Sequence, residues 1–289
     1  MLSLHTNNAS LSAQNSIAKT QSQLSTSMTR LSTGYRINSA MDDAAGLQIA
    51  TRLKAQTSGM TVAMSNTQNS TSMLQTAEGA FGEVTNMLIR MKDLATQAAD
   101  ASSNVDDKKA MQAEFDALGS ELANVMTNTT FGGSLLLGDG TGATGTLSSA
   151  MTFQIGASST EKMSIDVTAG MTGLAAALKA VSASFSTAGA AGTELTAAAN
   201  TAIGNLTTAI DKVGTVRSAL GAAANRLDHI NSNLSNIATN TKAATGRIMD
   251  VDFATESSNM TSSQMLLQAG TAMLKQSNSM SSMVMSLLQ

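Results

Sequence analysis

At 289 residues the chain is long enough for a sizeable core, but only 13% of it is charged and its formal net charge is −3. The lack of a basic stripe argues against nucleic-acid binding, and the absence of Cys excludes disulfides, thiolate metal sites and thiol catalysis. There is no Pro to break long helices, and the 20 Met are flexible apolar side chains that suit a packing seam. Composition therefore predicts packed helices in a protein that is not an enzyme and needs no cofactor.

The first predicted helix lies within residues 1–37 and has apolar residues at close to seven-residue spacing. These residues are Leu4, Leu11, Ile17, Leu24 and Leu31. Such spacing is typical of a seam where one helix packs on another. The segment has no continuous apolar run, so we expect no cleavable secretory signal peptide, and no part of the chain is apolar for long enough to predict a membrane span.

A second helix is predicted from about Asp43 to Ala99, because apolar residues step by three and four along it. A length of about 57 residues corresponds to a rod of roughly 85 Å, which is ordinary for a coiled coil. Polar residues at 38–43 and 100–106 interrupt the pattern and offer side chains that cap helices. A third helix is predicted from about Asp107 to Met126.

Beyond Asn128 the pattern changes from helix to strand. Residues 152–156 and 163–167 alternate apolar and polar side chains around a polar turn, which predicts a β-hairpin within 151–168. Residues 169–202 are rich in Ala, Gly, Ser and Thr. We expect this stretch to be a short, irregular insert.

The last third of the chain is helical again. Apolar residues across 203–248 share one register, polar residues at 250–252 mark a break, and a final helix is predicted from about Ala254 to Leu288. Apolar residues of this last helix include Leu266, Met273, Leu274, Val284 and Leu287. The predicted fold is mainly α: a long antiparallel helical bundle or coiled coil with a small β-hairpin region, both termini at one end and the insert at the other.

The two end segments are almost free of charge. Lys19 is the only fully charged residue between Met1 and Thr29, and Lys275 is the only one between Ser257 and Gln289. A solvated amphipathic helix normally has a charged outer face, whereas Ser, Thr, Asn and Gln can contact neighbouring subunits without the cost of burying ions. The ends therefore predict self-assembly through the ten apolar residues named above, with plain disordered tails as the alternative.

Residues that could carry chemistry are few. A G-x-G-x-x-G string at 140–145 leads to a strand instead of a helix, which favours a flexible loop over a dinucleotide site. His5 and His229 are far apart and lack the spacing of metal ligands. The Asp residues at 42–43 and 250–252 lie at helix breaks, where capping explains them.

Several motifs at both ends resemble those of bacterial flagellins. The run Arg-Leu-Ser-Thr-Gly-Tyr-Arg-Ile-Asn-Ser-Ala-Met-Asp-Asp-Ala-Ala-Gly-Leu at 30–47 is similar to their N-terminal signature. Further similar stretches follow in the same order at 75–80, 89–95, 128–133, 220–227, 247–254 and 268–271. The resemblance covers about residues 1–168 and 203–289.

This resemblance implies a subunit that polymerises into the extracellular flagellar filament used for motility. It implies that the chain is exported unfolded by the flagellar type III apparatus, with an export chaperone, and assembles under a cap next to junction proteins. Residues 1–43 and 246–289 would form the inner core of the filament, 44–168 and 203–245 its shell, and 169–202 a short outer insert. A hook–filament junction protein and a secreted coiled-coil adhesin or effector are the alternatives.

The resemblance extends to the shell-helix motif that a vertebrate innate receptor recognises in many flagellins. The matching residues are Arg90, Leu94 and Glu114, whereas Ile89 stands where the family commonly has Gln. The abundance of Met and the Met-containing stretch at 278–283 also depart from the common pattern. These departures indicate a divergent flagellin, such as a lateral or accessory one.

Overall fold

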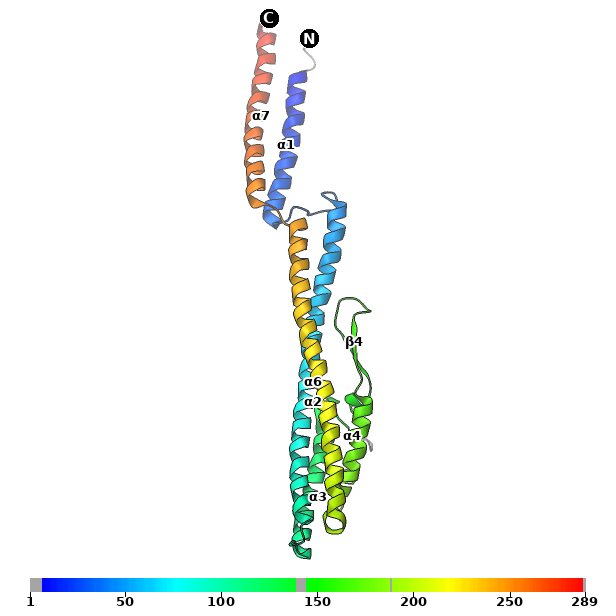
Figure 1. Ribbon diagram of the computed structural model, residues 1–289. Helices are drawn as coiled ribbons and strands as arrows, with labels where there is room; N and C mark the ends of the chain where they lie inside the picture. Colours follow the sequence, from blue (N-terminus) through cyan, green and yellow to red (C-terminus); the bar gives the residue numbers. More distant parts are fainter. Residues whose placement is uncertain (1–6, 139–143, 188, 288–289) are drawn as a thin grey trace. The chain divides into compact units, whose positions relative to one another are not determined.

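The computed structural model describes residues 7–138, 144–187 and 189–287, without the side chains of 281–287. These parts of the chain are mainly α-helical and include two antiparallel two-stranded sheets (Figure 1). The mainly-α class and its small β region are therefore confirmed. The chain divides into a terminal unit, residues 1–57 with 239–289, and a central unit, residues 58–238.

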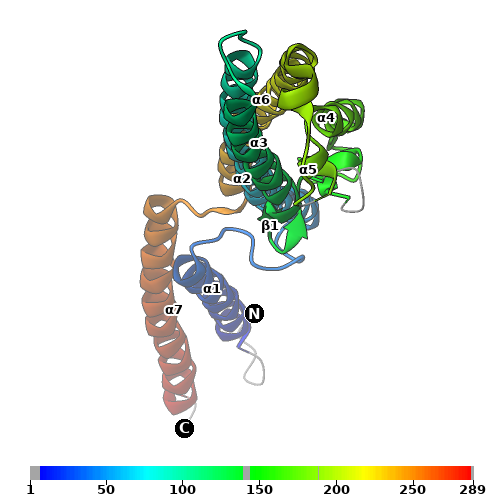
Figure 2. The same ribbon diagram turned by 90° about the horizontal axis from the view of Figure 1, so that it is seen from below.

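Three long helices supply most of the apolar residues of the central unit. They are α2 (Ala44–Ala98), α3 (Val105–Asn128) and α6 (Glu194–Met249). Because their apolar residues recur three and four apart, each helix buries one stripe in a shared core. Figure 2 shows how the helices of this unit are arranged in an end-on view. Phe81, Leu88 and Phe115 are completely buried there.

Side-chain caps explain where these helices begin. The Asp43 carboxylate accepts a hydrogen bond of 2.8 Å from the backbone N–H of Gly46, close to the predicted start of α2. At α3, Asn104 and Asp107 form a capping box in which each side chain accepts a bond from the other residue's backbone N–H. The cap is thus Asn104, and α3 begins two residues before the predicted Asp107.

Two hairpins follow α3. β1 (Thr130–Phe131) pairs with β2 (Ser134–Leu135) through Gly132 and Gly133, whose φ angles of +59° and +83° favour glycine at both central positions of the turn. The short 3-10 helix η1 (Thr146–Ser148) leads to β3 (Met151–Gln154), which pairs antiparallel with β4 (Lys162–Ile165). This second pair is the hairpin predicted within 151–168.

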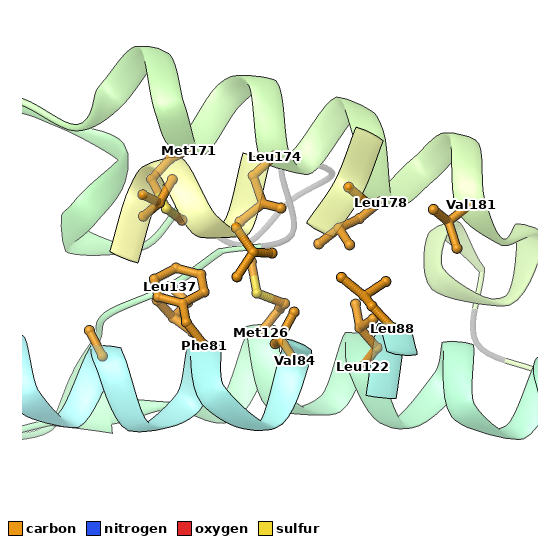
Figure 3. Packing of buried hydrophobic residues seen from close by; sticks show 14 of the residues in the cluster. Phe81, Val84, Leu88, Leu122, Met126, Leu137, Met171, Leu174, Leu178 and Val181 are labelled. Carbon is orange, nitrogen blue, oxygen red and sulfur yellow. The ribbon is translucent and has the colours of Figure 1, made fainter. Parts of the chain in front are cut away.

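The prediction of an irregular insert at 169–202 is wrong. Most of this stretch is helical: α4 (Thr168–Val181), the short α5 (Ala183–Ser186) and the first residues of α6. Apolar residues of α4 recur three and four apart and enter the same core as α2 and α3 (Figure 3). They are Met171, Leu174, Leu178 and Val181.

A buried glutamine fixes the return of the chain into α6. Gln112 of α3 is 5% exposed, and its amide nitrogen donates bonds of 2.8 Å to the carboxylates of Asp116 and Glu194. Its amide oxygen accepts a 2.7 Å bond from the backbone N–H of Leu195. The other Glu194 oxygen accepts the N–H of Ala183, which ties α5 to the start of α6. These bonds satisfy polar groups that burial would otherwise leave unpaired.

Candidate self-assembly surface

The terminal unit contains an antiparallel helix pair, α1 (Asn8–Thr33) and α7 (Phe253–Leu287), which lie side by side (Figure 1). At one end of the pair the Asn7 amide donates a 3.2 Å bond to the backbone oxygen of Ser277. Near its other end Arg30 lies beside Glu256. We call α1 and α7 together the terminal pair.

The terminal pair packs along a seam that has a seven-residue repeat in both helices. Besides Arg30, the less exposed residues of α1 are Ser10, Ala13, Ile17, Thr20, Leu24, Ser27 and Leu31. Those of α7 are Glu256, Met260, Ser263, Leu267, Gly270, Leu274 and Ser277. Steps of three and four alternate in both sets, which is the heptad geometry of a coiled coil.

Small and polar residues dominate this seam. A Cβ added to Gly270 would lie 2.9 Å from Cγ1 of Ile17, so glycine allows a close approach of the two helices. The Ser10 hydroxyl lies 3.1 Å from the Asn278 amide oxygen, to which it donates. The only buried residues of α1 within its described range are Ser10 and Ser27. The terminal pair therefore buries little apolar surface, and we expect it to be marginally stable in a single chain.

The predicted assembly residues fall into different environments. Ile17, Leu24, Leu31 and Leu274 lie in the seam. Residues outside the seam are Leu11, Leu266 and Met273, whose exposed fractions are 54%, 59% and 70%. Leu4 lies outside the described residues, as do the side chains of Val284 and Leu287.

At the N-terminal end of α1, the seam position is residue 10, one residue before the predicted Leu11. Its true repeat is 10, 17, 24 and 31, so Leu11 follows a seam position instead of occupying one. Sequence reasoning missed Ser10, Ser27, Leu267 and Gly270. For Ser27 and Gly270, the signal that could have found them is a small residue three or four positions from a seam leucine.

A second apolar face of α7 is open to solvent. It consists of Met265, Leu266, Ala269, Ala272, Met273 and Met280. Leu266 and Met273 each precede a seam residue, so they lie about 100° around the helix from the seam. The positions of Val284 and Leu287 continue the same three–four spacing. We call this set the exposed face of α7, and nothing in the described part of the chain covers it.

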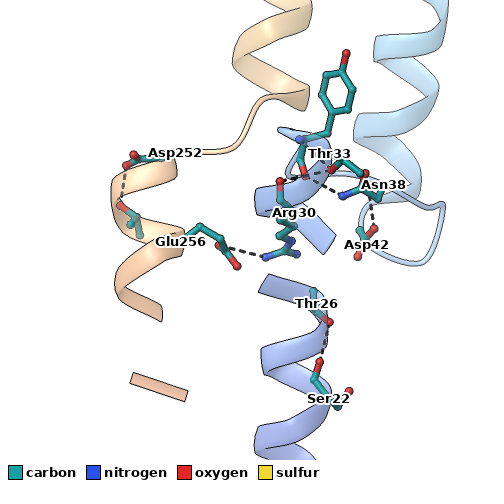
Figure 4. A network of polar contacts seen from close by, with 10 residues as sticks. Ser22, Thr26, Arg30, Thr33, Asn38, Asp42, Asp252 and Glu256 are labelled. Carbon is teal, nitrogen blue, oxygen red and sulfur yellow. Dashed lines mark hydrogen bonds and ion pairs between the residues drawn. The ribbon is translucent and has the colours of Figure 1, made fainter. Parts of the chain in front are cut away.

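A partly buried ion pair crosses the seam of the terminal pair (Figure 4). The Arg30 guanidinium lies 3.8 Å from the Glu256 carboxylate, and the Glu256 side chain is only 10% exposed. Because shifting one helix by a turn would leave these charges apart and buried, the pair favours a single register. α1 then ends at Gly34, whose φ of +76° is the left-handed conformation typical of a helix C-cap.

The loop after α1 is tied to the segment before α7. The backbone N–H of Arg36 donates to the Met249 oxygen at 2.6 Å, and that of Val251 donates to the Gly34 oxygen at 3.0 Å. Tyr35 and Asp250 form an isolated antiparallel β-bridge. These bonds hold the loop that follows α1 against the short segment between α6 and α7, both within the terminal unit.

Asp42 closes the signature loop by accepting bonds from the backbone N–H groups of Asn38 and Ser39 and from the Ser39 hydroxyl (Figure 4). The backbone bond from Ser39 is the largest cause that lowers the pKa of Asp42 below its ordinary value of 3.8. A lowered folded-state pKa stabilises the loop above the ordinary pKa, and this effect is lost as the pH falls through the lowered value.

We expect a carboxyl-carbon NMR titration of Asp42 to have its midpoint below 3.8. Because the backbone contributes the larger effect, Ser39→Ala should retain most of the lowering. Asp42→Asn should remove the pH dependence of the amide shift of Ser39. A midpoint at or above the ordinary value would contradict the loop geometry.

The residues matched to the receptor motif lie on α2 and α3 of the central unit. Arg90 and Glu114 are about half exposed and form an ion pair of 2.7 Å. Leu94, in contrast, is 2% exposed and belongs to the core. Ile89 is 47% exposed, so the departure from the common motif lies on the surface.

The parts of the chain that the structure describes contain no group of three or more His, Asp and Glu residues placed to hold a metal ion. His229 lies within α6, whereas His5 and part of the glycine string at 140–145 lie outside the described residues. No described helix combines the length and the apolarity that crossing a membrane requires.

A helix pair with few charged residues that buries little and leaves an apolar face open is typical of a subunit that associates with its own copies. Two family descriptions match the chain: the bacterial flagellin N-terminal helical region over residues 4–142 and the bacterial flagellin C-terminal helical region over residues 203–288. The chain therefore belongs to the bacterial flagellin family, whose members are structural subunits of the flagellar filament.

Known relatives agree with this assignment. Flagellin A of Vibrio cholerae serotype O1 is 32% identical in an alignment of 384 residues that covers 100% of both chains. The B-type flagellin of Pseudomonas aeruginosa is 45% identical over 166 residues, which are 57% of this chain and 33% of that relative. A putative flagellar hook-associated protein from Vibrio parahaemolyticus shares the fold, with a TM-score of 0.57 over 72% of this chain and 100% of that chain at 17% identity.

Proposed function

We propose that the chain polymerises through its terminal pair, with the exposed face of α7 covered by neighbouring copies. The observation that carries this proposal is the apolar face itself, in which Met273 is 70% and Leu266 59% exposed. Residues 1–43 and 246–289 would then form the inner layer of the filament, residues 44–168 and 203–245 its shell, and residues 169–202 part of its outer surface.

The charge pattern supports contact between copies. Residues 257–289 contain one charged side chain, Lys275, so identical helices can approach without strong repulsion. The Thr261 hydroxyl of α7 donates to the backbone oxygen of Ser257 one turn back, so the Thr261 oxygen can still accept a bond from a neighbouring copy. Polymerisation would add stability that the terminal pair lacks in a single chain.

We further propose that the chain leaves the cell unfolded through the flagellar type III apparatus with an export chaperone. It would then assemble outside the cell beneath a cap and next to junction proteins. The support for this step is family membership together with the small apolar burial of the terminal pair. A marginal terminal pair has little structure to lose before passage through a narrow channel.

Electron microscopy of purified chain seeded with filament fragments tests the polymerisation proposal. Wild type should extend the seeds into long tubes, and the double variant Leu266→Gln with Met273→Gln should raise the critical concentration at least about tenfold. Ala176→Gln is the matched control on an exposed position of α4 and should polymerise normally. Persistent monomers or short rings from wild type would favour a junction protein or a secreted coiled-coil adhesin or effector.

Recognition by a vertebrate innate receptor is a separate proposal, supported by the exposed Arg90–Glu114 pair. Because Leu94 is buried, we assign it a role in holding α2 in place and assign direct contact to Arg90 and Glu114. A receptor reporter-cell assay should respond to purified chain, and Arg90→Ala should weaken the response about tenfold or more. No response to the wild-type chain at a saturating dose would contradict this proposal.

A further inference from the structure

Some methionines of the described chain are buried and others are exposed to solvent; Met28 and Met41 belong to the exposed group, at 57% and 96%. In the central unit Met91 and Met126 are 0% and Met163 2% exposed. On α7, Met265, Met273 and Met280 are 60%, 70% and 57% exposed. Thioether oxidation requires access of the oxidant to sulfur, so the exposed group should react first.

The exposed methionines lie on the surface that is proposed to join the copies. Met265, Met273 and Met280 supply half of the six residues in the exposed face of α7. Oxidation turns a flexible apolar side chain into a polar, chiral sulfoxide. Burying that sulfoxide against an apolar neighbour costs free energy, because the new oxygen loses its bonds to water.

We propose that Met265, Met273 and Met280 are oxidation sites that control whether the free chain can polymerise. In the reaction the thioether sulfur attacks one oxygen of hydrogen peroxide, the O–O bond breaks, and a new S–O bond forms. The sulfide is oxidised by two electrons to the sulfoxide, and the peroxide is reduced to water. Methionine sulfoxide reductases supplied with a thiol reductant return the thioether: two thiols are oxidised to a disulfide, the sulfoxide oxygen leaves as water, and the capacity to assemble returns.

The timing of this effect follows from the same geometry. A free chain exposes all three sulfur atoms, whereas a polymerised chain would cover them with neighbouring copies. Oxidation would therefore block chains that have not yet joined a filament and spare those already assembled. The inference rests on the proposed polymerisation through the exposed face of α7.

The test uses the full chain, hydrogen peroxide and seeded polymerisation, with mass spectrometry to locate each sulfoxide. After limited oxidation we expect sulfoxide at Met265, Met273 and Met280 before Met91 or Met126, and a critical concentration raised about tenfold. Treatment with both stereospecific sulfoxide reductases should restore polymerisation. The three α7 sulfurs should also react about tenfold more slowly in preformed filaments.

The matched variant replaces Met265, Met273 and Met280 by Leu, which keeps the face apolar and removes the sulfur atoms. It should polymerise before and after peroxide treatment. Normal assembly of wild type that carries sulfoxide at all three positions would overturn the inference, as would equal loss of assembly in the Leu variant after peroxide. If the Leu variant does not assemble, two other measurements replace it. Met273→Leu alone should lose less polymerisation than wild type after peroxide treatment, and the three α7 methionines of wild type should oxidise more slowly in filaments than in the free chain. Failure of untreated wild type to polymerise contradicts the proposed function instead, and the inference falls with it.

Discussion

Removal of residues 260–289 should abolish filament formation and leave the central unit folded. The deletion takes away most of α7, including the whole exposed face and Gly270, which approaches Ile17 in the seam. The core that contains Phe81, Leu88 and Phe115 has no residue from this segment. Seeded electron microscopy should show no extension of the seeds, whereas guanidinium unfolding followed by circular dichroism should retain a cooperative transition.

Two outcomes would contradict this expected result. Filaments from the truncated chain would place the assembly surface elsewhere. Loss of the cooperative transition would show that the central unit depends on the terminal pair. Removal of residues 1–30 is the parallel test, because it deletes most of α1 and leaves the same core intact.

Leu178→Ala should destabilise the central unit by about 2–5 kcal/mol. Leu178 is 0% exposed and packs from α4 into the core that α2 and α3 share (Figure 3). Truncating it leaves a cavity that a close-packed interior fills only in part. Guanidinium unfolding of the variant should show a lower midpoint with an unchanged slope.

The control for this substitution is Thr172→Ala, at an exposed position of the same helix. It should change the free energy of unfolding by less than about 0.5 kcal/mol. A similarly small effect of Leu178→Ala would mean that α4 does not belong to the core. The irregular insert expected from the sequence would then describe this stretch better.

Most of the fold could be predicted from the sequence where local signals agree. The apolar three–four spacing in α2 and α6 and the polar breaks around Asp43 and Asn104 indicated long helices and their approximate starts. The strand pair β3–β4 followed from alternation. α4 was missed because Ala, Gly and Thr between its buried residues dilute the apolar pattern and resemble a loop.

The candidate site was only partly predictable, because its exact register depends on tertiary contacts. Leucines mark the seam at Leu24 and Leu31, but Ser10 and Gly270 enter it through close approach of the two helices, which no single helix pattern specifies. The motif around Arg90 likewise indicates the family, but it does not predict which of its residues are exposed. Only the structure shows that Leu94 points into the core.

The central unit provides the stability of the single chain, and the terminal unit provides the proposed assembly surface. The central unit has a continuous apolar core, whereas the terminal pair contains small seam residues and the partly buried Arg30–Glu256 ion pair. Such a division suits a subunit whose ends acquire their full stability only among copies. It also explains why α7 has an exposed apolar face with few charged residues around it: neighbouring copies would cover that face.

The central claim is that neighbouring copies cover the exposed face of α7, and maleimide labelling tests it most directly. Because the chain has no native Cys, Ala269→Cys on that face and Ala176→Cys on α4 give matched single reporters at exposed alanines. Both should react rapidly in the free chain. In filaments Ala269→Cys should become protected while Ala176→Cys stays reactive; equal reactivity of the two in filaments would contradict the claim.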